Sequence, residues 1–491
     1  MRRILFLLLT NSSLIQLSEG IVFLYKRVKG SFMKTTKIIR RIILVSMFIL
    51  LIVYLSAHYD KSEYSGTDID GYVRKMCEIY DVPGLSAAII DGDNEYYISF
   101  GENIDEDSRF ELASTTKAFT ALGILKLEKE GKLHTSDKVS DYLPWFKPTY
   151  KGKECDITIE ELLCHTGGIP AWTISTIPVA EGDKEGGLER TVLNIKDVKL
   201  NSEPGTRHEY ATINYDVLAL ILESVTSEKY ENYIQDEILK PLDMPESFFR
   251  VNDADTQNAV QGHKTAFFLP LEDNAPTYYG NTAAGYLVSS ASDLMKWLKV
   301  WGVDSKDSSP FSDLVSVALS HEITGTNNYY AGWNIYDDYI CHGGNNPNFS
   351  SQVIIARDRN QGVFVLSNLA GSSATMIADG IYRILLGEKV KIGLQLDYIA
   401  LADFFSIEVI LLILYLLMLL WNIKSKKACI VSVVVSIMLI VAATIFPVVF
   451  HYPYSSMLVW LPVTTCIAIG LMVAGSVILT SSYLFRRASR R

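Results

Sequence analysis

Three long apolar runs close the chain, and they constrain its fold more than any other feature of the sequence. The runs cover roughly residues 404–423, 428–450 and 457–484, with short loops between them. An α-helix rises about 1.5 Å per residue, so about 20 apolar residues cross the roughly 30 Å hydrocarbon layer of a membrane. One such run could be the core helix of a soluble protein. Three in succession predict a bundle of three transmembrane helices at residues 404–491.

A fourth apolar run, residues 42–57, follows a stretch rich in lysine and arginine near the N-terminus. This order of charged and then apolar residues is typical of a signal peptide or an N-terminal anchor, which we place at residues 33–57. Residues 1–32 have only short and broken apolar stretches, so we interpret them as an uncertain leader, with Met33 as an alternative start. Whether the leader is cleaved stays open.

Positive charges flank the apolar runs unevenly. Lysines and arginines precede the first run, fill the loop at 424–427 and close the chain after residue 485, whereas the loop at 451–456 has no lysine, arginine, aspartate or glutamate. Cytoplasmic flanks of membrane spans are rich in lysine and arginine. Four spans with both ends inside therefore predict a multi-pass protein of a bacterial cytoplasmic membrane, with residues 58–403 on the exterior side.

The exterior section is acidic. Residues 58–403 carry 29 lysines and arginines against 53 aspartates and glutamates, which excludes a nucleic-acid-binding surface. The four cysteines in this section show neither the spacing of metal ligands nor a dense disulfide framework. We expect no metal and no cofactor. A bridge between Cys155 and Cys164 stays open in an exterior compartment.

The exterior section combines strand patterns at both ends with helical patterns in the middle. Two strand-like runs joined by a DGDN turn come first, and four more come between residues 330 and 367, which predicts an α+β domain whose sheet is completed by distant segments. The strand-like runs are residues 85–90, 95–101, 330–336, 339–342, 349–356 and 362–367, and the helical segments are residues 70–80, 214–225, 228–239, 289–300 and 374–386, besides the helix that carries Ser114. Thr158 with Glu161 three residues on is typical of a capping box and predicts a further helix start.

Ser114 and Lys117 begin a segment that is apolar on nearly every face, which predicts a buried helix. Positions three residues apart share a helix face. A buried lysine has a lowered pKa and can take the proton of a serine hydroxyl, so the pair predicts a nucleophile with its base. A surface lysine whose stem snorkels outward is the alternative. Such an enzyme also needs a second proton carrier, for which Tyr210 and His342 are candidates.

With these residues in view, residues 70–390 resemble the superfamily of serine β-lactamases, penicillin-binding proteins and D-amino-acid peptidases, of class C type. Ser114-Thr-Thr-Lys117 matches its Ser-x-x-Lys motif, and His342-Gly343-Gly344 resembles its His-x-Gly variant of Lys-Thr-Gly. Three more segments are similar to motifs of the family: ELLCHTGGIP at 161–170, ILKPLDM at 238–244 and AAGYLVSSASDL at 283–294. The resemblance implies a β-lactamase/transpeptidase-like domain, an antiparallel sheet flanked by helices with a helical subdomain.

The resemblance also implies the roles of the site residues. Ser114, Lys117, Tyr210 and His342 are the expected catalytic residues, with the backbone N–H groups of Ser114 and Asn345 around the oxyanion. Tyr230-Glu231-Asn232 fits the Tyr-x-Asn motif literally, but it lies inside an amphipathic helix and is interpreted as a chance match. Ser31-Phe-Met-Lys34 is a second chance match, and His165 is expected to be structural.

The membrane architecture is similar to that of bacterial prodrug-activating peptidases of the ClbP type, which remove an N-acyl-D-asparagine cap. This likeness predicts a D-amino-acid-specific peptidase acting on a small peptide or acyl-D-amino acid, with the oligomeric state open. Alternatives are a β-lactamase, a D-alanyl carboxypeptidase or endopeptidase, a D-alanyl esterase of cell-wall polymers, and a non-catalytic penicillin-binding sensor. The expected substrate-binding residues are Glu111, Thr212, His263, Gly344 and Asn345, with Asn346 beside them.

Overall fold

The computed structural model describes residues 63–64, 66–179, 186–250, 259–302, 309–321, 328–392, 398–422, 426–450 and 453–488. The leader and the anchor predicted at residues 1–57 lie outside these ranges. The chain forms two compact units. The larger unit joins Asp60–Ile407 with Ile440–Met472, and the smaller unit includes Glu408–Leu439 and Val473–Arg491.

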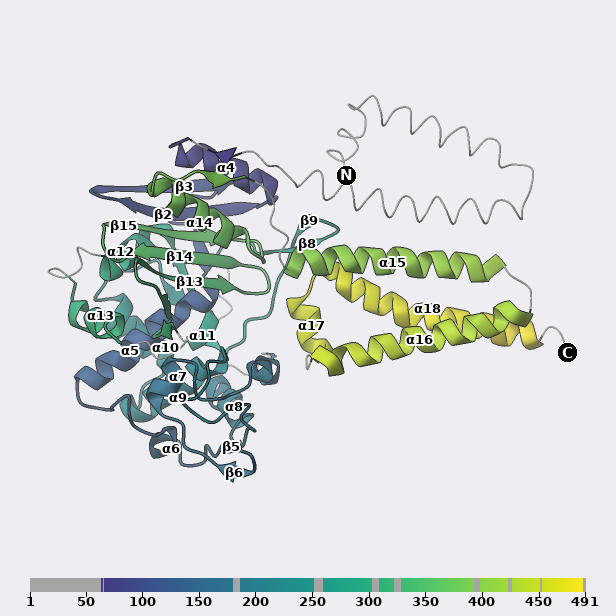
Figure 1. The fold of residues 1–491 in the computed structure, drawn as a ribbon, viewed down its shortest axis with the longest axis horizontal. Helices are drawn as coiled ribbons and strands as arrows, with labels where there is room; N and C mark the ends of the chain where they lie inside the picture. Colours follow the sequence, from purple (N-terminus) through teal and green to yellow (C-terminus); the bar gives the residue numbers. More distant parts are fainter. Residues whose placement is uncertain are drawn as a thin grey trace. The chain divides into compact units, whose positions relative to one another are not determined.

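A seven-stranded antiparallel sheet organises the larger unit, in the order β11-β12-β13-β14-β15-β2-β3 (Figure 1). Strands far apart in the sequence lie side by side in it, because β15 pairs with β2 from Gln361↔Asp91 to Ser367↔Leu85. The predicted α+β class is therefore confirmed. The strands are β2 (Gly84–Asp91), β3 (Asn94–Gly101), β11 (Tyr329–Tyr330), β12 (Trp333–Ile335), β13 (Tyr339–Asn345), β14 (Ser350–Ala356) and β15 (Gln361–Ser367).

Both faces of this sheet are buried, each under its own helices. Successive residues of a strand point to opposite faces, and in β2 Ala88 and Ile90 join one apolar core while Ala87 and Ile89 join the other. The first core contains α5 (Lys117–Lys129) and α12 (Ala291–Trp301); the second contains α4 (Ile69–Ile79) and α14 (Ser373–Leu385).

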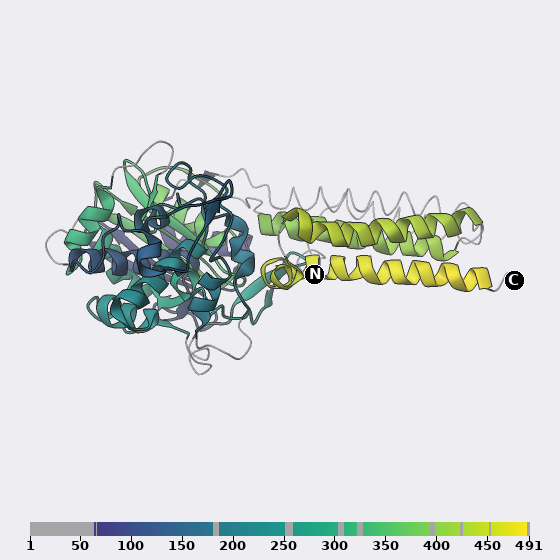
Figure 2. The same cartoon turned by 90° about the horizontal axis from the view of Figure 1, so that it is seen from below.

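The remaining helices of the larger unit also pack into the first core, together with α5 and α12. Figure 2 views the molecule from below, the side on which α6 to α9 lie in Figure 1. The capping box predicted at Thr158 and Glu161 is confirmed at the start of α7. Cys155 and Cys164 are both free thiols in the structure. The helices are α6 (Val139–Tyr142), α7 (Ile159–Leu163), η3 (Ala171–Thr176), α8 (Gly187–Leu193), α9 (Ile213–Thr226), α10 (Tyr230–Ile234), η4 (Gln235–Leu239), α11 (Thr282–Gly285) and α13 (Ser312–Leu319).

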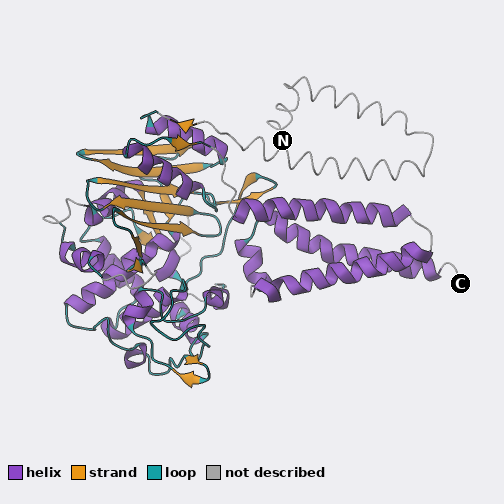
Figure 3. Ribbon diagram, in the orientation of Figure 1, coloured by secondary structure: helices purple, strands orange, loops and turns teal. Residues whose placement is uncertain are grey.

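Several short strands were not predicted, because two to four residues are too few to show an alternating pattern. Figure 3 shows some of them apart from the main sheet. The predicted strand at 330–336 is also divided, since Ala331 and Gly332 have φ of 51° and 87° and turn the chain back. The additional pairs are β1 (Glu63–Tyr64) with β16 (Val390–Lys391), β5 (Thr149–Tyr150) with β6 (Lys153–Glu154), β8 (His263–Ala266) with β9 (Leu269–Glu272), and β10 (Leu287–Ser290) with both β4 (Arg109–Glu111) and β7 (Phe248–Phe249).

The C-terminal region is helical: α15 (Tyr398–Asn422), α16 (Lys426–Phe450), α17 (Tyr454–Trp460) and α18 (Val463–Ala488). Within the described residues, two segments are long and apolar enough to cross a membrane, Tyr398–Leu417 and Val463–Ser481; a third, Val433–Ile445, is shorter. The separate helix α17 was not predicted.

Candidate active site

Ser114 lies in a single 3₁₀ turn, η2 (Ala113–Thr116), that leads directly into α5. Ala113 before it has φ of 50°, a left-handed conformation that an alanine adopts only under strain. The turn is held by the carbonyl of Leu112, which accepts hydrogen bonds from Thr115 Oγ1 at 2.7 Å and Ser351 Oγ at 2.5 Å. The serine is thereby fixed on a rigid turn and keeps partial exposure to solvent.

Lys117 is fully buried at the start of α5, so the alternative of a surface lysine is wrong. Its Nζ lies 3.0 Å from Ser114 Oγ, 3.0 Å from Thr212 Oγ1 and 2.7 Å from the carbonyl oxygen of Ala284. A neutral amine has two N–H groups and one lone pair. With the N–H groups donated to Thr212 and Ala284, the lone pair faces the serine hydroxyl, which is the arrangement that a general base requires.

Burial lowers the pKa of Lys117 to about 7, against the opposing charge of Asp216. Near neutral pH a large fraction of this lysine is therefore the free amine. Asp216 is itself fully buried in α9, and burial raises the pKa of its carboxyl. The Asn281 amide reaches Asp216 at 2.8 and 3.2 Å with its nitrogen turned toward the carboxylate. Sequence analysis missed Asp216, although a lone charge within the apolar pattern of INYDVLALIL is a signal for it.

We expect acylation to depend on the free amine of Lys117. The kcat/KM for an uncharged ester should fall about tenfold per pH unit below about 7 and level off above it, because kcat/KM reports ionisations of the free enzyme. His342 does not titrate in this range, since burial lowers its pKa to about 3; burial also lowers the pKa of His165 well below 6.5. A profile that is flat from pH 5 to 9 would contradict a lysine base.

Asp216→Asn should move the midpoint of this pH profile to lower pH. Removing a negative charge beside Lys117 disfavours its protonated form, so the free amine persists to lower pH. The comparison needs only the two pH profiles, measured on proteins of equal thermal stability. An unchanged midpoint would mean that Asp216 carries no charge beside the lysine.

Tyr210 follows the Pro204-Gly205 turn, in which Gly205 has φ of 77°, and precedes α9. Its hydroxyl is buried, and among the described residues it has no hydrogen-bond partner. Burial raises the pKa of this hydroxyl, and the nearby Ser114 side chain opposes the rise. The Tyr210 and Ser114 hydroxyls do not form a hydrogen bond in the structure. Catalytic hydrogen bonds are often loose without substrate, so the hydroxyl is available to a reacting group at Ser114.

His165 packs against the ring of Tyr210. Their ring centroids lie 4.2 Å apart, and His165 Nδ1 lies 2.9 Å from the side-chain nitrogen of Asn214 and 3.4 Å from the backbone nitrogen of Ala211. The His165 carbonyl also accepts a hydrogen bond from Glu209 N at 2.9 Å. These contacts give His165 the role of holding the loop that carries the tyrosine.

His342 is buried in β13, with its ring centroid 6.2 Å from that of Tyr210. Its Nε2 lies 3.1 Å from the hydroxyl of Tyr329. Burial and the charge of Lys117 lower its pKa to about 3. The imidazole is therefore neutral at neutral pH and adds polarity near Tyr210 without adding a charge.

Gly344 brings β13 against the nucleophile turn. A Cβ on this residue would lie 2.4 Å from Ser351 Oγ, 2.5 Å from the carbonyl oxygen of Leu112 and 2.9 Å from Ala113 Cβ. Real Cβ atoms almost never approach so closely, and the neighbours are partly backbone. The close packing of these two segments is possible only with glycine at this position.

Gly344→Ala is expected to lower the acylation rate by about a hundredfold or more, the cost of misplacing one oxyanion donor. The strand must move away from the turn that carries Ser114. Gly362→Ala is the matched control in the same sheet, because its Cβ would meet neighbours only at 3.5 Å and beyond. Equal acylation rates of Gly344→Ala and wild type would show that the contact between β13 and the Ser114 turn does not position the catalytic groups.

The other expected substrate-binding residues are engaged within the protein. Thr212 is buried on Lys117, as described above. Glu111 is buried in an ion pair with Arg250 at 2.7 Å and accepts a hydrogen bond from Asn346 Nδ2 at 2.7 Å. Glu111 and Asn346 thus pin the β13–β14 turn to β4, and Thr212 orients the lysine.

Asn345 and His263 also contact other parts of the protein. The Asn345 side chain accepts a hydrogen bond from Gly371 N at 2.8 Å and donates one to the hydroxyl of Tyr398. His263 is half-buried at the base of the β8–β9 hairpin, with Nδ1 3.2 Å from the carbonyl oxygen of Asn368. Asn345 follows Gly344 directly on β13, whereas His263 contacts the loops that follow β13 and β15, through the backbone of Asn348 and Asn368.

Tyr230 lies apart from this group. Its hydroxyl is buried 2.7 Å from Thr120 Oγ1, and its ring packs against Phe249 at 5.3 Å. These are packing and framework contacts. The structure therefore brings Tyr210, and not Tyr230, to Ser114 and Lys117.

Comparisons with known proteins agree with this geometry. The family model described as Beta-lactamase matches residues 69–388. The chain belongs to the beta-lactamase family. This is a family of serine hydrolases, so the resemblance found in the motifs is confirmed at the level of the superfamily. The likeness to prodrug-activating peptidases of the ClbP type stays a prediction.

Two curated relatives have related sequences. "Protein flp" of Staphylococcus aureus (strain MW2) is 32% identical over 321 residues, which are 62% of this chain and 63% of that protein. The match thus spans less than two thirds of the relative's length. The "Putative D-alanyl-D-alanine carboxypeptidase" of Escherichia coli (strain K12) is 34% identical over 148 residues, 28% of this chain and 33% of that protein.

Solved structures share the fold. The octameric penicillin-binding protein homologue from Pyrococcus abyssi has a TM-score of 0.57 and 26% identity, covering 65% of this chain and 77% of that one. EstCE1, a hydrolase with promiscuous acyltransferase activity, has a TM-score of 0.56 and 17% identity, covering 64% and 97%. At that identity, the likeness to EstCE1 shows the fold alone.

Proposed function

We propose that this beta-lactamase-family protein hydrolyses amide or ester bonds through an acyl-enzyme on Ser114. The observation that carries the proposal is the buried lysine, whose Nζ lies 3.0 Å from Ser114 Oγ and whose pKa is lowered to about 7. A serine hydroxyl becomes an effective nucleophile when an adjacent base takes its proton. In the proposed first step Lys117 takes that proton while Oγ bonds to the carbonyl carbon.

Tyr210 completes the proton transfer in this proposal. The proton taken by Lys117 passes through the tyrosine hydroxyl to the leaving nitrogen or oxygen, and the bond to the leaving group breaks. A water molecule then gives a proton to the same path and attacks the acyl carbon. The bond between this carbon and Oγ breaks, the carboxylic acid leaves, and the proton returns to Oγ to restore the serine hydroxyl. The buried and unpartnered Tyr210 hydroxyl beside Ser114 supports this role.

The oxyanion is proposed to lie between the backbone N–H groups of Ser114 and Asn345. The support is the tight packing of Gly344, the residue before Asn345, against the turn that carries Ser114. A 3₁₀ turn and a strand edge are both rigid, and rigid donors cost no reorganisation during the reaction.

For the substrate we propose the amide of an N-acyl-D-amino acid, so that the protein is a D-amino-acid peptidase. The position of Asn345 directly after Gly344 and the membrane architecture support this choice, while the Asn345 side chain itself is engaged with Gly371 and Tyr398. Because Thr212 and Glu111 are engaged with Lys117 and Arg250, fewer groups remain to bind an asparagine side chain than the sequence predicted. The second candidate is a D-alanyl-D-alanine carboxypeptidase, which the name of the Escherichia coli relative favours.

Substrate comparison separates these candidates. The full-length protein in detergent is assayed with N-acyl-D-asparaginyl, N-acyl-L-asparaginyl and D-alanyl-D-alanine peptides and with a penicillin, and kcat/KM is compared. The proposal expects the D-asparaginyl amide to be cleaved fastest. Faster cleavage of D-alanyl-D-alanine or of the penicillin would favour the carboxypeptidase or β-lactamase alternative, and cleavage of none would favour a sensor.

We also propose that residues 404–491 cross the cytoplasmic membrane three times, with the catalytic domain 58–403 outside. The two apolar segments of α15 and α18 and the shorter segment of α16 support this arrangement. Alkaline phosphatase joined after residue 392 should be active, and green fluorescent protein joined at the C-terminus should fluoresce. The opposite pattern would place the catalytic domain in the cytoplasm.

A further inference from the structure

The β8–β9 hairpin has an unusual turn. Phe267 and Phe268 join its two strands with φ of 52° and 62°, so both are left-handed. Two-residue hairpin turns of this kind favour asparagine and glycine. Two bulky residues in this conformation are strained, and such strain persists only where surrounding contacts hold it.

Asp403 provides those contacts. Its carboxylate accepts hydrogen bonds from Phe268 N at 2.8 Å and Phe267 N at 3.2 Å, and the hydroxyl of Thr464 donates to it as well. Asp403 is fully buried, and it belongs to the same compact unit as the hairpin and Thr464. The turn therefore has both of its amides paired with one side chain.

Asp403 places the hairpin tip beside two candidate membrane spans. Asp403 lies inside the apolar segment Tyr398–Leu417, and Thr464 lies at the start of the segment Val463–Ser481. The ring of Phe268 also packs against Phe404, with centroids 6.5 Å apart. The tip thus lies beside the second turn of one candidate membrane span, and Asp403 connects it to the first turn of the other.

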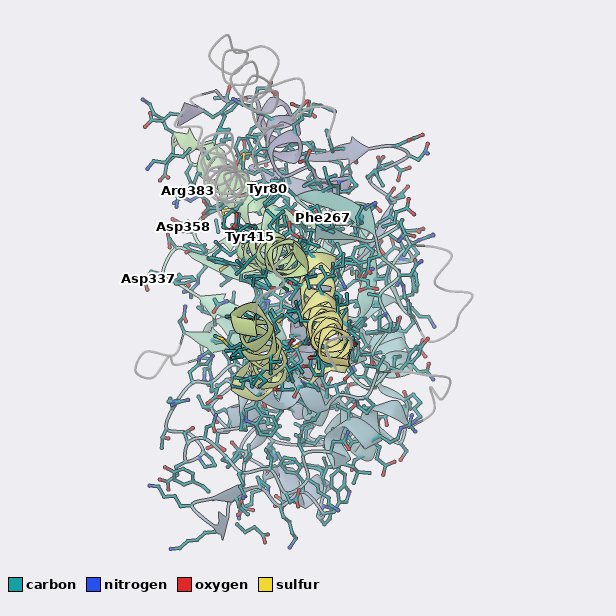
Figure 4. The ribbon with its side chains drawn as sticks, turned by 90° about the vertical axis from the view of Figure 1, so that its right-hand side faces the viewer. Tyr80, Phe267, Asp337, Asp358, Arg383 and Tyr415 are labelled. Carbon is teal, nitrogen blue, oxygen red and sulfur yellow. The ribbon has the colours of Figure 1, made fainter. Side chains whose placement is uncertain are left out.

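One face of the tip is apolar and uncovered. Phe267, Leu269 and Leu271 are 45%, 43% and 44% exposed, and Phe267 is labelled in Figure 4. Alternate residues of a strand share a face, so Leu269 and Leu271 point to one side of β9, and Phe267 is exposed at the turn next to them. The hairpin base is polar, since Glu272 pairs with His263 across the strands.

We propose that the tip of the β8–β9 hairpin is inserted in the exterior leaflet of the membrane, with the Phe267, Leu269 and Leu271 face against lipid and Asp403 fixing its depth. The inference rests on the proposed membrane crossing of α15 and α18. A backbone segment enters hydrocarbon only if its polar groups are paired. Strand pairing satisfies the backbone groups between the two strands, and Asp403 satisfies the two N–H groups of the turn. The outer edges of the strands would lie at the level of the polar headgroups.

Lys264 gives the hairpin a second attachment beside the membrane. This buried lysine donates to the carbonyl oxygen of Val459 in α17 and lies 3.5 Å from a carboxylate oxygen of Asp273. Leu458 in the same short helix is 61% exposed, as expected of a helix that lies in the interface. The hairpin tip and α17 would then form one lipid-facing surface.

Depth-dependent fluorescence quenching tests the proposal on the full chain in lipid nanodiscs. An environment-sensitive fluorescent amino acid replaces Leu269, and phospholipids carry a nitroxide quencher near the headgroup. Val477, 60% exposed in α18, is the matched position inside a span, and Tyr336, 42% exposed in the catalytic domain, is the matched position in water. We expect a probe at 269 to be quenched at least about threefold more than a probe at 336.

The outcomes separate this proposal from the membrane crossing itself. Quenching at 477 but not at 269 would overturn the inserted hairpin and leave the membrane crossing intact. Quenching at neither position would overturn both. Loss of lipid quenching at 269 together with cross-linking to a second copy of the chain would show that the apolar face is a dimer contact, and would also overturn the proposal.

Asp403→Leu tests whether the hydrogen bonds from the turn to the Asp403 carboxylate fix the depth of the tip. This variant removes both acceptors of the turn amides, so quenching at 269 should fall toward the level at 336, while the probe at 477 is unaffected. Asp403→Asn keeps one carbonyl acceptor and should retain most of the quenching. Unchanged quenching at 269 in Asp403→Leu would show that the carboxylate does not fix the depth of the tip.

Discussion

Lys117→Met is expected to lower the rate of acylation by about a thousandfold, the effect of removing a general base. Methionine fills a similar volume in the buried space and has no proton-accepting amine. The loss should appear in kcat/KM for an activated ester and in the rate of covalent modification by a fluorescent penicillin or a phosphonate. The thermal midpoint should not fall, because the variant no longer buries an ionisable group.

Lys126→Met is the control for this experiment. Lys126 lies on the same helix α5, but it is a surface residue paired with Glu130 and Glu237. Exposed ion pairs contribute about 0–1 kcal/mol to stability, so this variant should react at the wild-type rate. If both lysine variants react like wild type, another group takes the serine proton.

Tyr210→Phe is expected to lower acylation by about a hundredfold to a thousandfold, since it removes the proposed proton relay and keeps the ring. The ring continues to pack against His165, so the loop should stay in place. The effect should be larger for an amide than for an ester with a good leaving group, because an ester oxygen needs less help from a proton.

Tyr230→Phe provides the matched comparison. It removes the hydroxyl that lies 2.7 Å from Thr120 Oγ1, so it should cost about 1 kcal/mol of stability and leave the rate within about twofold of wild type. Equal rate losses in the two tyrosine variants would contradict the assignment of Tyr210. A loss confined to Tyr230→Phe would reverse it.

The sequence predicted the residues of the site better than their partners. Ser114 and Lys117 are recognisable because a lysine is costly to bury in an apolar segment, and Tyr210 because it follows a Pro-Gly turn directly before a helix. The partners of Lys117, Ala284 and Asp216, come from α11 and α9, and only the fold brings those helices to the lysine. Thr212 was predicted, but as a substrate contact.

The hairpin at 263–272 was not predicted from the sequence, for a different reason. Its turn is Phe-Phe, where local sequence rules expect asparagine or glycine, so no turn signal marks it. Asp403, which lies more than 130 residues further along the chain, holds this turn. The long strands of the main sheet, β2, β3, β13, β14 and β15, were predictable because they are long enough to show their pattern, and β15 pairs with β2 along its whole length.

The central claim is that Ser114 is the nucleophile of an acyl-enzyme, and covalent labelling tests it most directly. The full-length protein is incubated with an alkyl fluorophosphonate, digested and examined by mass spectrometry. We predict a single modified peptide with the added mass on Ser114, and no modification of Ser114→Ala. Absence of an adduct from wild type under all conditions tried, including penicillins and activated esters, or an adduct on another residue that persists in Ser114→Ala, would contradict the account.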